Sequence, residues 1–304
     1  MSISHAINAA QSGLKVSGLR ADIVATNVAN ASTPGYVRRS VLLGETLVGG
    51  RTSGVTATGV TRSADAALTA ERRTLSSDVA QASLMSSTWQ VLSSRLGDDA
   101  EGTGLFSKFS KFEAALSASV TSPESGTQLA ALLDSANAVV TELNSLSKLV
   151  SQQRSEADRE IADGVKVVNK ALKQIEELNG LLVGVDGSTS QAAALMDERQ
   201  RTLDTIAEYL PIEVVPREGG AIDIITVEGV YLVAGKAKQL DFSPANSFGA
   251  DMTLDNGALS GLTIDGQNLT PGASSYAAVS SGMFGALFTL RDTDLPAFGA
   301  QLDT

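Results

Sequence analysis

The chain has 304 residues, 43% of them apolar, so it is long enough to form more than one hydrophobic core. It carries 34 Asp and Glu against 23 Lys and Arg, and the net charge of −11 disfavours nucleic acid and anionic membranes as partners. Without cysteine it can form neither disulfides nor thiolate metal sites, and a single histidine leaves little scope for zinc or Ser-His chemistry.

We therefore expect no catalytic residue, no cofactor and no metal site. His5 lies off the apolar positions of the first helix, where a solvated side chain is expected rather than a partnered base. No segment reaches the ~20 apolar residues of a membrane-spanning helix, and the N-terminus lacks a secretory signal peptide. Composition alone thus predicts a soluble protein that does not insert into a membrane.

The first predicted element is a long helix from Ile3 that stops by about Thr33. Its small and apolar residues alternate in steps of four and three, the spacing of a coiled-coil seam. The seam consists of Ile3, Ile7, Ala10, Leu14, Ser17, Ala21, Val24 and Val28. Because a narrow seam buries little area, this helix needs neighbours. We expect assembly to depend on Ile3, Ile7, Leu14, Val24 and Val28.

The end of this helix is marked by Thr33-Pro34-Gly35-Tyr36. Pro at the second position and Gly at the third are typical of a type II turn. We expect the exit turn to be fixed by six residues: Asn27, Asn30, Thr33, Pro34, Gly35 and Tyr36.

An N-terminal helix ending in Asn-x-Ala-Asn-x-x-Thr-Pro-Gly-Tyr is similar to the signature of bacterial flagellar axial proteins, the rod, hook and hook-associated subunits. Members of that class leave the cell through a type III export channel that uses a mobile N-terminus and no cleaved signal. The resemblance therefore implies an extracellular location in the bacterial flagellum.

The segment 37–62 is rich in Gly, Thr and Val, and predicts an extended connection with short strands at Ser40–Leu43 and Val55–Val60. The residues from Ser53 to Asp65 also resemble the flagellar class, in which such a segment leads into the next helix. The glycine spacing matches neither a P-loop nor a dinucleotide fingerprint.

A second helix is predicted from about Ser63 to Leu96. Its inward residues should fall seven apart, with Met85 and Leu92 between them: Leu68, Leu75, Ala82, Trp89 and Leu96. We expect Trp89 to be a core residue, because an indole buries a large apolar area.

A short helix carrying Leu105, Phe109, Phe112 and Leu116 should follow. Ser122-Pro123-Glu124 then predicts the start of a further helix, with a cap, a proline and a carboxylate in order. The three-four apolar pattern extends to about Leu182, with a possible break near Ser151–Asp158. Helices of this length are typical of a rod-like bundle.

Another helix is predicted from about Gln191 to Leu210, and its charged run 197–201 should form a salt-bridged exposed face. The block from Leu195 to Leu203 resembles the hook-associated protein 1 family, as do four later features: Val214-Val215, Ile224, Leu232-Val233 and Ala234-Gly235. This resemblance implies the subunit class that joins hook to filament.

From Ile212 to about Leu269 short β-prone runs alternate with turns. Hairpin connections are expected at 218–220, 255–257 and 264–267. Helix-forming sequence resumes at Ser281–Asp292, again as in the family. The chain should thus contain an N-terminal coiled-coil-forming helix and turn (1–36), an extended connection (37–62), a long helical bundle (63–211), a small β unit (212–280) and a truncated return into the helical domain (281–304).

The resemblance covers nearly all of these residues but only the first part of the family pattern. Family members carry a further distal domain and a C-terminal heptad helix that pairs with the N-terminal helix, so we expect a chain truncated after Thr304. The family implies three kinds of partner: copies of itself in a ring or tubular zone, the hook protein and a neighbouring hook-associated protein, and an export chaperone.

The predicted fold is mainly α with a β part: long heptad-patterned helices in a coiled-coil-like bundle plus a small β unit. The predicted function is a structural subunit at the junction between hook and filament, assembling through its terminal helices. Another flagellar axial subunit, a hook or rod protein, is the alternative. A hydrolase or metal enzyme is disfavoured because the sequence lacks a convergent acid-base motif.

Overall fold

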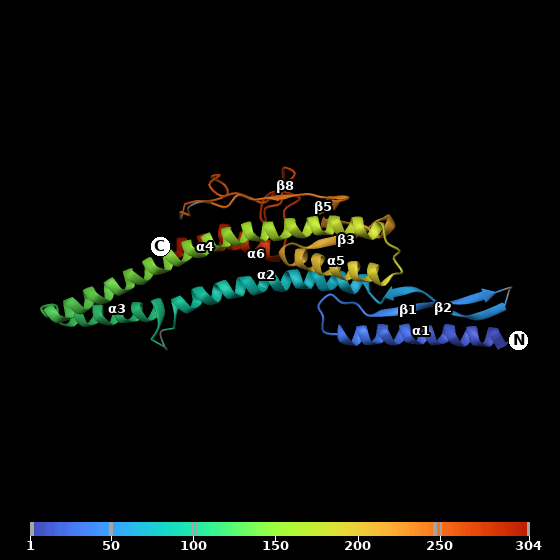
Figure 1. Ribbon diagram of the computed structural model, residues 1–304. Helices are drawn as coiled ribbons and strands as arrows, with labels where there is room; N and C mark the ends of the chain where they lie inside the picture. Colours follow the sequence, from blue (N-terminus) through green and yellow to red (C-terminus); the bar gives the residue numbers. More distant parts are fainter. Residues whose placement is uncertain are drawn as a thin grey trace. The chain divides into compact units, whose positions relative to one another are not determined.

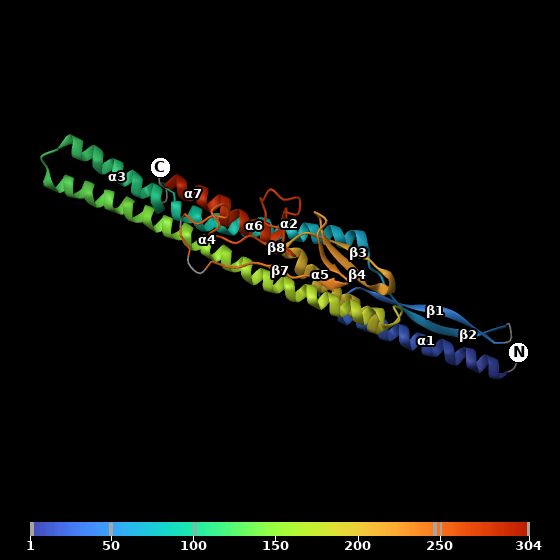
Figure 2. The same cartoon turned by 90° about the horizontal axis from the view of Figure 1, so that it is seen from above.

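The computed structural model describes residues 3–48, 51–98, 100, 102–245, 248–249 and 251–302. Long helices dominate it and the strands are short, which confirms the predicted fold class (Figures 1 and 2). The helices are α1 (Ile3–Ala29), α2 (Ala66–Leu96), α3 (Gly104–Thr121), α4 (Gly126–Val183), α5 (Ser190–Tyr209), α6 (Gly282–Thr289) and α7 (Leu295–Leu302), with a π-helical turn η2 (Leu290–Asp294) before α7.

The strands form antiparallel sheets of neighbours in the sequence. The first sheet contains β1 (Arg39–Val48) and β2 (Arg51–Arg62). The second contains β3 (Ile212–Pro216), β4 (Ile222–Thr226), β5 (Tyr231–Ala234) and β6 (Lys236–Ala237), with a short 3-10 turn η1 (Glu218–Gly220) between β3 and β4. The third contains β7 (Leu240–Asp241), β8 (Thr263–Ile264) and β9 (Gln267–Asn268).

The chain divides into two compact units, and α2 and α4 contribute to both. The first unit comprises residues 1–76 and 167–239, and the second comprises residues 77–166 and 240–304. The strands after Ile212 accordingly form two separate sheets in different units, where the sequence analysis expected one β unit over 212–280. Each short sheet is built from local hairpins and covers the helices of its own unit.

In the first unit, α1 lies along the hairpin formed by β1 and β2 (Figures 1 and 2). The expected strands at 40–43 and 55–60 lie inside these longer strands, so the predicted extended connection is a paired hairpin. Its register runs from Arg39 opposite Arg62, with irregularities after Leu42 and Thr46.

The second sheet is fixed to the C-terminal part of α4. The side chain of Asn179 donates to the Ile222 carbonyl at 2.8 Å and accepts from the Ile222 amide at 3.1 Å. Glu176 accepts from the Ala237 amide at 2.9 Å. Two polar side chains of α4 thus form hydrogen bonds with backbone groups of β4 and β6. Unpaired backbone groups at these positions would destabilise the sheet.

In the second unit, α3 runs alongside the first part of α4, and Lys108 forms an ion pair with Glu142 (Figures 1 and 2). The apolar core joins α2, α4, η2 and α7. Its buried members are Leu92, Val150, Leu290 and Leu295, and Leu84, Met85, Leu149, Phe298 and Leu302 pack against them.

The helix α4 is continuous, so the predicted break near Ser151–Asp158 is wrong. This polar stretch contains Arg154 and Asp158, which are both buried. Asp158 accepts from the Arg291 guanidinium at 2.6 Å, and Arg154 donates to the Arg291 carbonyl at 2.9 Å. The charged residues lie inside the unit and are paired there, and therefore do not interrupt the helix.

Two further expectations on local structure are corrected. The helix α4 begins at Gly126, after Ser125, whose hydroxyl accepts from the Gln128 amide at 3.4 Å, so Ser122-Pro123-Glu124 precedes the helix. The turn at 255–257 connects no strands, whereas the turns at 218–220 and 265–266 join β3 to β4 and β8 to β9.

The stripe predicted to point inward from α2 is largely exposed. Leu68 and Leu75 are 65% and 57% exposed, and Trp89 is only edge-packed against Phe298 at a centroid distance of 6.0 Å. Trp89 is therefore not a core residue. The buried residues of α2 include the apolar Leu92 and also polar residues such as Arg73, which forms an ion pair with Asp204. A heptad pattern predicts an apolar face on a helix, but it does not predict whether residues of the same chain or of another chain cover that face.

Candidate functional site

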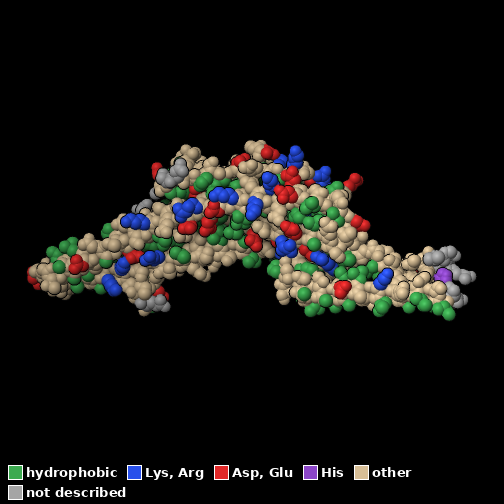
Figure 3. Space-filling model, viewed as in Figure 1, with side chains coloured by type: hydrophobic (Ala, Val, Ile, Leu, Met, Phe, Trp, Pro, Cys, Tyr) green, Lys and Arg blue, Asp and Glu red, His purple; other side chains and the backbone are tan. Residues whose placement is uncertain are grey.

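The predicted assembly seam is an exposed apolar face of α1. Ile3, Ile7, Leu14, Val24 and Val28 are all between 51% and 80% exposed. Figure 3 shows hydrophobic side chains along the lower edge of this helix, at the right of the view. Isolated exposed apolar residues are ordinary, but a stripe of five on one helix face is typical of an interaction surface.

The opposite face of α1 packs on the hairpin. Val16 and Ile23 are the buried apolar residues of this helix. The Ser12 hydroxyl accepts from the Val55 amide of β2 at 3.1 Å. At Gly54, with φ 146°, a Cβ atom would lie 2.3 Å from the Ser12 hydroxyl oxygen, so this approach requires glycine. The hairpin leaves the seam open.

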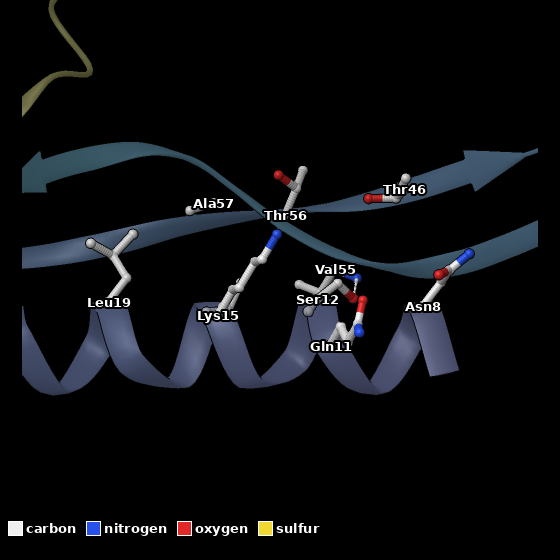
Figure 4. Close-up of a pocket in the computed structure, with 10 residues that line it drawn as sticks. Asn8, Gln11, Ser12, Lys15, Leu19, Thr46, Val55, Thr56 and Ala57 are labelled. Carbon is white, nitrogen blue, oxygen red and sulfur yellow. Dashed lines mark hydrogen bonds between the residues drawn. The ribbon is translucent and has the colours of Figure 1, made fainter. Parts of the chain in front are cut away.

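A groove of about 410 Å³ lies between α1 and the hairpin (Figure 4). Figure 4 shows Lys15 extending from α1 toward Thr56 on the hairpin. The other lining residues include Asn8, Gln11, Leu19 and Thr46. Among the described residues that line this groove, Lys15 is the one with an ionisable side chain.

The predicted exit turn is formed by Thr33 to Tyr36. The Tyr36 amide donates to the Thr33 carbonyl at 3.1 Å, and Gly35 has φ 75°. This left-handed conformation at the third position is what a Pro-Gly turn of type II requires. A Cβ atom on Gly35 would also lie 2.3 Å from Cγ of Arg201 in α5, so the glycine allows the turn to approach α5.

Asn27 connects the end of α1 to the turn and to the hairpin. Its side-chain oxygen accepts from the Tyr36 hydroxyl at 2.8 Å and from the Arg39 amide at 2.9 Å. Its side-chain nitrogen donates to the Arg39 carbonyl at 2.8 Å. One amide side chain thereby satisfies both backbone groups at the start of β1.

Asn30 and Thr33 make local contacts that end the helix. The Asn30 side chain donates to the Thr26 carbonyl at 2.9 Å, and the Thr33 hydroxyl donates to the Asn30 side-chain oxygen at 3.3 Å. The structure therefore brings the motif residues together in one turn, while the seam residues lie on a separate face of α1.

Asp197 in α5 binds both strands at the base of the hairpin. Its carboxylate accepts from Arg39 at 2.7 Å and from Arg62 at 2.9 and 2.7 Å. The Asp197 side chain is only 4% exposed, so the predicted exposed face at 197–201 is wrong at this position. Because Arg39 and Arg62 are paired across the hairpin, one carboxylate fixes both strands to α5.

Two ion pairs secure the start of α2 to α5. Asp204 accepts from Arg73 at 3.0 Å and from Arg72 at 2.6 Å. Burial lowers the pKa of Arg73, an effect that the hydrogen bond with Asp204 opposes. At the other end of α5, the Val60 amide donates to the Ser188 carbonyl at 2.6 Å. The helix α5 therefore acts as the common anchor for the hairpin and for α2.

The contacts of Arg39, Arg62 and Ser12 were not predicted from the sequence, and Asp197 was predicted to be exposed. Asp197 is 158 residues from Arg39 in the sequence and 135 from Arg62, and no local pattern reveals a pair at that distance. A buried carboxylate needs a partner, but the sequence around Asp197 identifies neither its burial nor its partners.

Among the residues that the structure describes, no group of three or more His, Asp or Glu is placed to hold a metal ion. None of the helices within the described ranges combines the length and hydropathy needed to cross a bilayer. The helix α1 is hydrogen-bonded to the exit turn and the hairpin, and it has an exposed apolar face.

Comparison with protein families gives two matches. Residues 90–304 match the model described as the flagellar hook-associated protein FlgK helical domain. Residues 7–36, which contain the seam and the exit turn, match the flagella basal body rod protein model.

Curated relatives and a solved structure are similar over most of the chain. Flagellar hook-associated protein 1 of Salmonella typhimurium is 24% identical over 303 residues, and that of Escherichia coli K12 is 24% identical over 304 residues. Both alignments cover 96% of this chain and 53% of the relative, so the chain spans about half the length of these proteins. The flagellar hook junction protein FlgK from Burkholderia pseudomallei has the same fold over 75% of this chain and 39% of its own, with a TM-score of 0.56 and 17% identity.

Proposed function

This chain belongs to the flagellar hook-associated protein FlgK family, and we propose that it is part of the structural subunit that joins the flagellar hook to the filament. The observation that supports this most strongly is the exposed seam of α1, because a stripe of apolar residues on a braced helix gains most when covered by partner helices. The match of residues 90–304 to the helical domain of the family supports this class of subunit.

The mechanism that we propose is mechanical. Seams of α1 from neighbouring subunits pack together, while the Asp197 and Asn27 contacts hold each α1 at a fixed direction relative to its own hairpin and α5. Ile3, Ile7, Leu14, Val24 and Val28 supply the apolar contacts of this packing. Buried apolar area at about 25 cal/mol per Å² then stabilises the assembly.

The partners in this proposal are copies of the same subunit in a ring or tubular zone, the hook protein and a neighbouring hook-associated protein. An export chaperone is a further proposed partner. The subunit is exported without a cleaved signal peptide and works outside the cell, in a structural role without catalysis. The net charge of −11 disfavours nucleic acid as a partner.

The alternative is another axial subunit, a hook or rod protein, and the match of residues 7–36 to the rod protein model supports it for the N-terminal part. Electron microscopy of cells deleted for the gene separates the two. The junction proposal predicts hooks without filaments and flagellin shed into the medium, restored by the full-length gene. Missing hooks would support the alternative, and unaltered flagella would contradict both.

A further inference from the structure

A cleft of about 540 Å³ in the first unit lies apart from the seam of α1. Its walls come from the start of α2, from α5 and from the strands β3 and β4. Three arginines, Arg62, Arg73 and Arg199, are among its lining residues. A concentration of guanidinium groups is unexpected in a chain whose net charge is −11.

Two of these arginines already have carboxylate partners. Arg62 shares Asp197 with Arg39, and Arg73 shares Asp204 with Arg72. The charges of Arg62 and Arg73 are therefore balanced by carboxylates, Arg72 is 52% exposed, and the third arginine that lines the cleft is Arg199.

Arg199 has only neutral partners. Its Nη1 atom donates to the Gly220 carbonyl at 2.7 Å and to the Asn179 side-chain oxygen at 3.3 Å. Within the part of the chain that the structure describes, no carboxylate lies within ion-pair distance of Arg199. Glu71 and Glu213 also line the cleft, but both are exposed and neither pairs with Arg199.

The surroundings of Arg199 increase the cost of its charge. Apolar side chains form much of the cleft wall, among them Met196, Leu203, Ile212 and Ile222. Burial lowers the pKa of Arg199 to about 10, and repulsion from Arg62 and Arg73 adds to the effect. A partly buried charge with neutral partners is stabilised strongly when an opposite charge binds beside it.

We propose that this cleft binds an oxyanion group, a carboxylate or a phosphate-like anion, with Arg199 as its main ligand. A guanidinium presents donors in a planar fork that matches the two oxygens of such a group, and the low polarity of the walls strengthens the contact. The group can come from a free small anion or from an acidic side chain of a second copy of this chain. The latter source rests on the proposed assembly.

The test uses inorganic phosphate as the probe and thermal unfolding of the purified protein as the readout, with ionic strength held constant by sodium chloride. Ligand binding to the folded state raises the midpoint, and the rise continues with the logarithm of the phosphate concentration once this exceeds the Kd. We expect this rise in the wild type and in Arg159→Gln, which removes one exposed arginine elsewhere. We expect its loss in Arg199→Gln and a weaker rise in Arg199→Lys, which keeps the charge without the fork.

An equal rise in Arg199→Gln, or none in the wild type, would overturn the proposal. Should Arg199→Gln fail to fold, Arg199→Lys decides the matter: an unweakened phosphate response in this variant would overturn the proposal as well. Incorporation of Arg199→Gln into flagella separates the sources, since loss indicates a neighbour's carboxylate and normal incorporation indicates a free anion. Phosphate binding is measured on the purified protein, so its outcome does not depend on the proposed assembly.

Discussion

The side-chain oxygen of Asn27 and the hydroxyl of Tyr36 lie 2.8 Å apart, so the last full turn of α1 is bonded to the residue that closes the exit turn. Asn27 also makes two hydrogen bonds with the backbone of Arg39, at 2.9 and 2.8 Å. The direction in which the chain leaves α1 therefore depends on one amide side chain.

Replacing Asn27 by Ala should destabilise the protein more than replacing Tyr36 by Phe. Asn27→Ala leaves an amide and a carbonyl of Arg39 unpaired, at a cost of about 1–3 kcal/mol, whereas Tyr36→Phe removes one hydrogen bond worth about 0.5–1.5 kcal/mol. Urea denaturation measures both differences. Tyr276→Phe, at an 82% exposed tyrosine, is the control and should change little. A larger loss in Tyr36→Phe than in Asn27→Ala would contradict this role for Asn27.

Substitution of Gly35 should reveal two separable costs. Gly35→Val forces a β-branched residue to φ 75° and drives its side chain against Arg201, so we expect a loss of stability on the order of 1 kcal/mol or more. Introducing Arg201→Ala into the Gly35→Val protein should recover the part due to the contact and leave the backbone strain. An unchanged melting curve for Gly35→Val, together with normal assembly, would contradict the turn geometry.

Neutralising Asp197 should be among the most damaging single changes in the first unit. Asp197→Asn leaves the largely buried Arg39 and Arg62 without a charged partner, and breaking a buried pair costs about 3–5 kcal/mol. Asp163→Asn is the matched control, since Asp163 pairs with Lys166 on the surface and such pairs contribute about 0–1 kcal/mol. Equal effects of the two substitutions in guanidinium denaturation would contradict the account.

The turn before α5 should make stability depend on pH. The pKa of Asp186 is lowered from 3.8 chiefly by the hydrogen bond from the Ser188 amide and then by that from its hydroxyl. Since the folded state holds this proton less tightly, the carboxylate contributes stability above pH 3.8, and the contribution is lost as pH falls through the folded pKa.

Asp186→Asn keeps an oxygen that can accept the same bonds but has no charge. The wild type should therefore be more stable than this variant at neutral pH, and the difference should vanish in acid below the folded pKa. Urea unfolding at a series of pH values from about 3 to 7 measures it. A difference that stays constant over this range would contradict the prediction.

Periodicity and turn chemistry predicted the elements that depend on local sequence. The apolar spacing between Ile3 and Val28 predicts a helix, and the structure has the helix α1 there. The Pro34-Gly35 pair predicts a turn with a left-handed glycine, and Gly35 has a positive φ. The same spacing could not say which face of α1 is covered. Val16 and Ile23 are the buried apolar residues of α1, and the hairpin that follows α1 packs against this helix.

Contacts between distant segments explain the other differences. The polar run that contains Arg154 and Asp158 led to the prediction of a break in the helix. Both side chains are instead buried and hydrogen-bonded to Arg291, which is more than 130 residues away in the sequence. Asp197 was predicted to lie on the surface for the same reason, because its partner Arg39 is far away in the sequence. Single-residue chemistry shows that such a group needs a partner if it is buried, but it does not identify the partner.

Incorporation of seam variants into flagella tests most directly whether the exposed face of α1 mediates assembly. Leu14→Asp, in the full-length gene product, places a charge at the centre of the seam, and His5→Asp places the same charge on an exposed position of α1 outside the seam. We predict that Leu14→Asp is absent from isolated flagella although the purified protein keeps amide-exchange protection in α4, whereas His5→Asp is incorporated normally. Wild-type levels of Leu14→Asp in flagella that carry filaments would contradict the account.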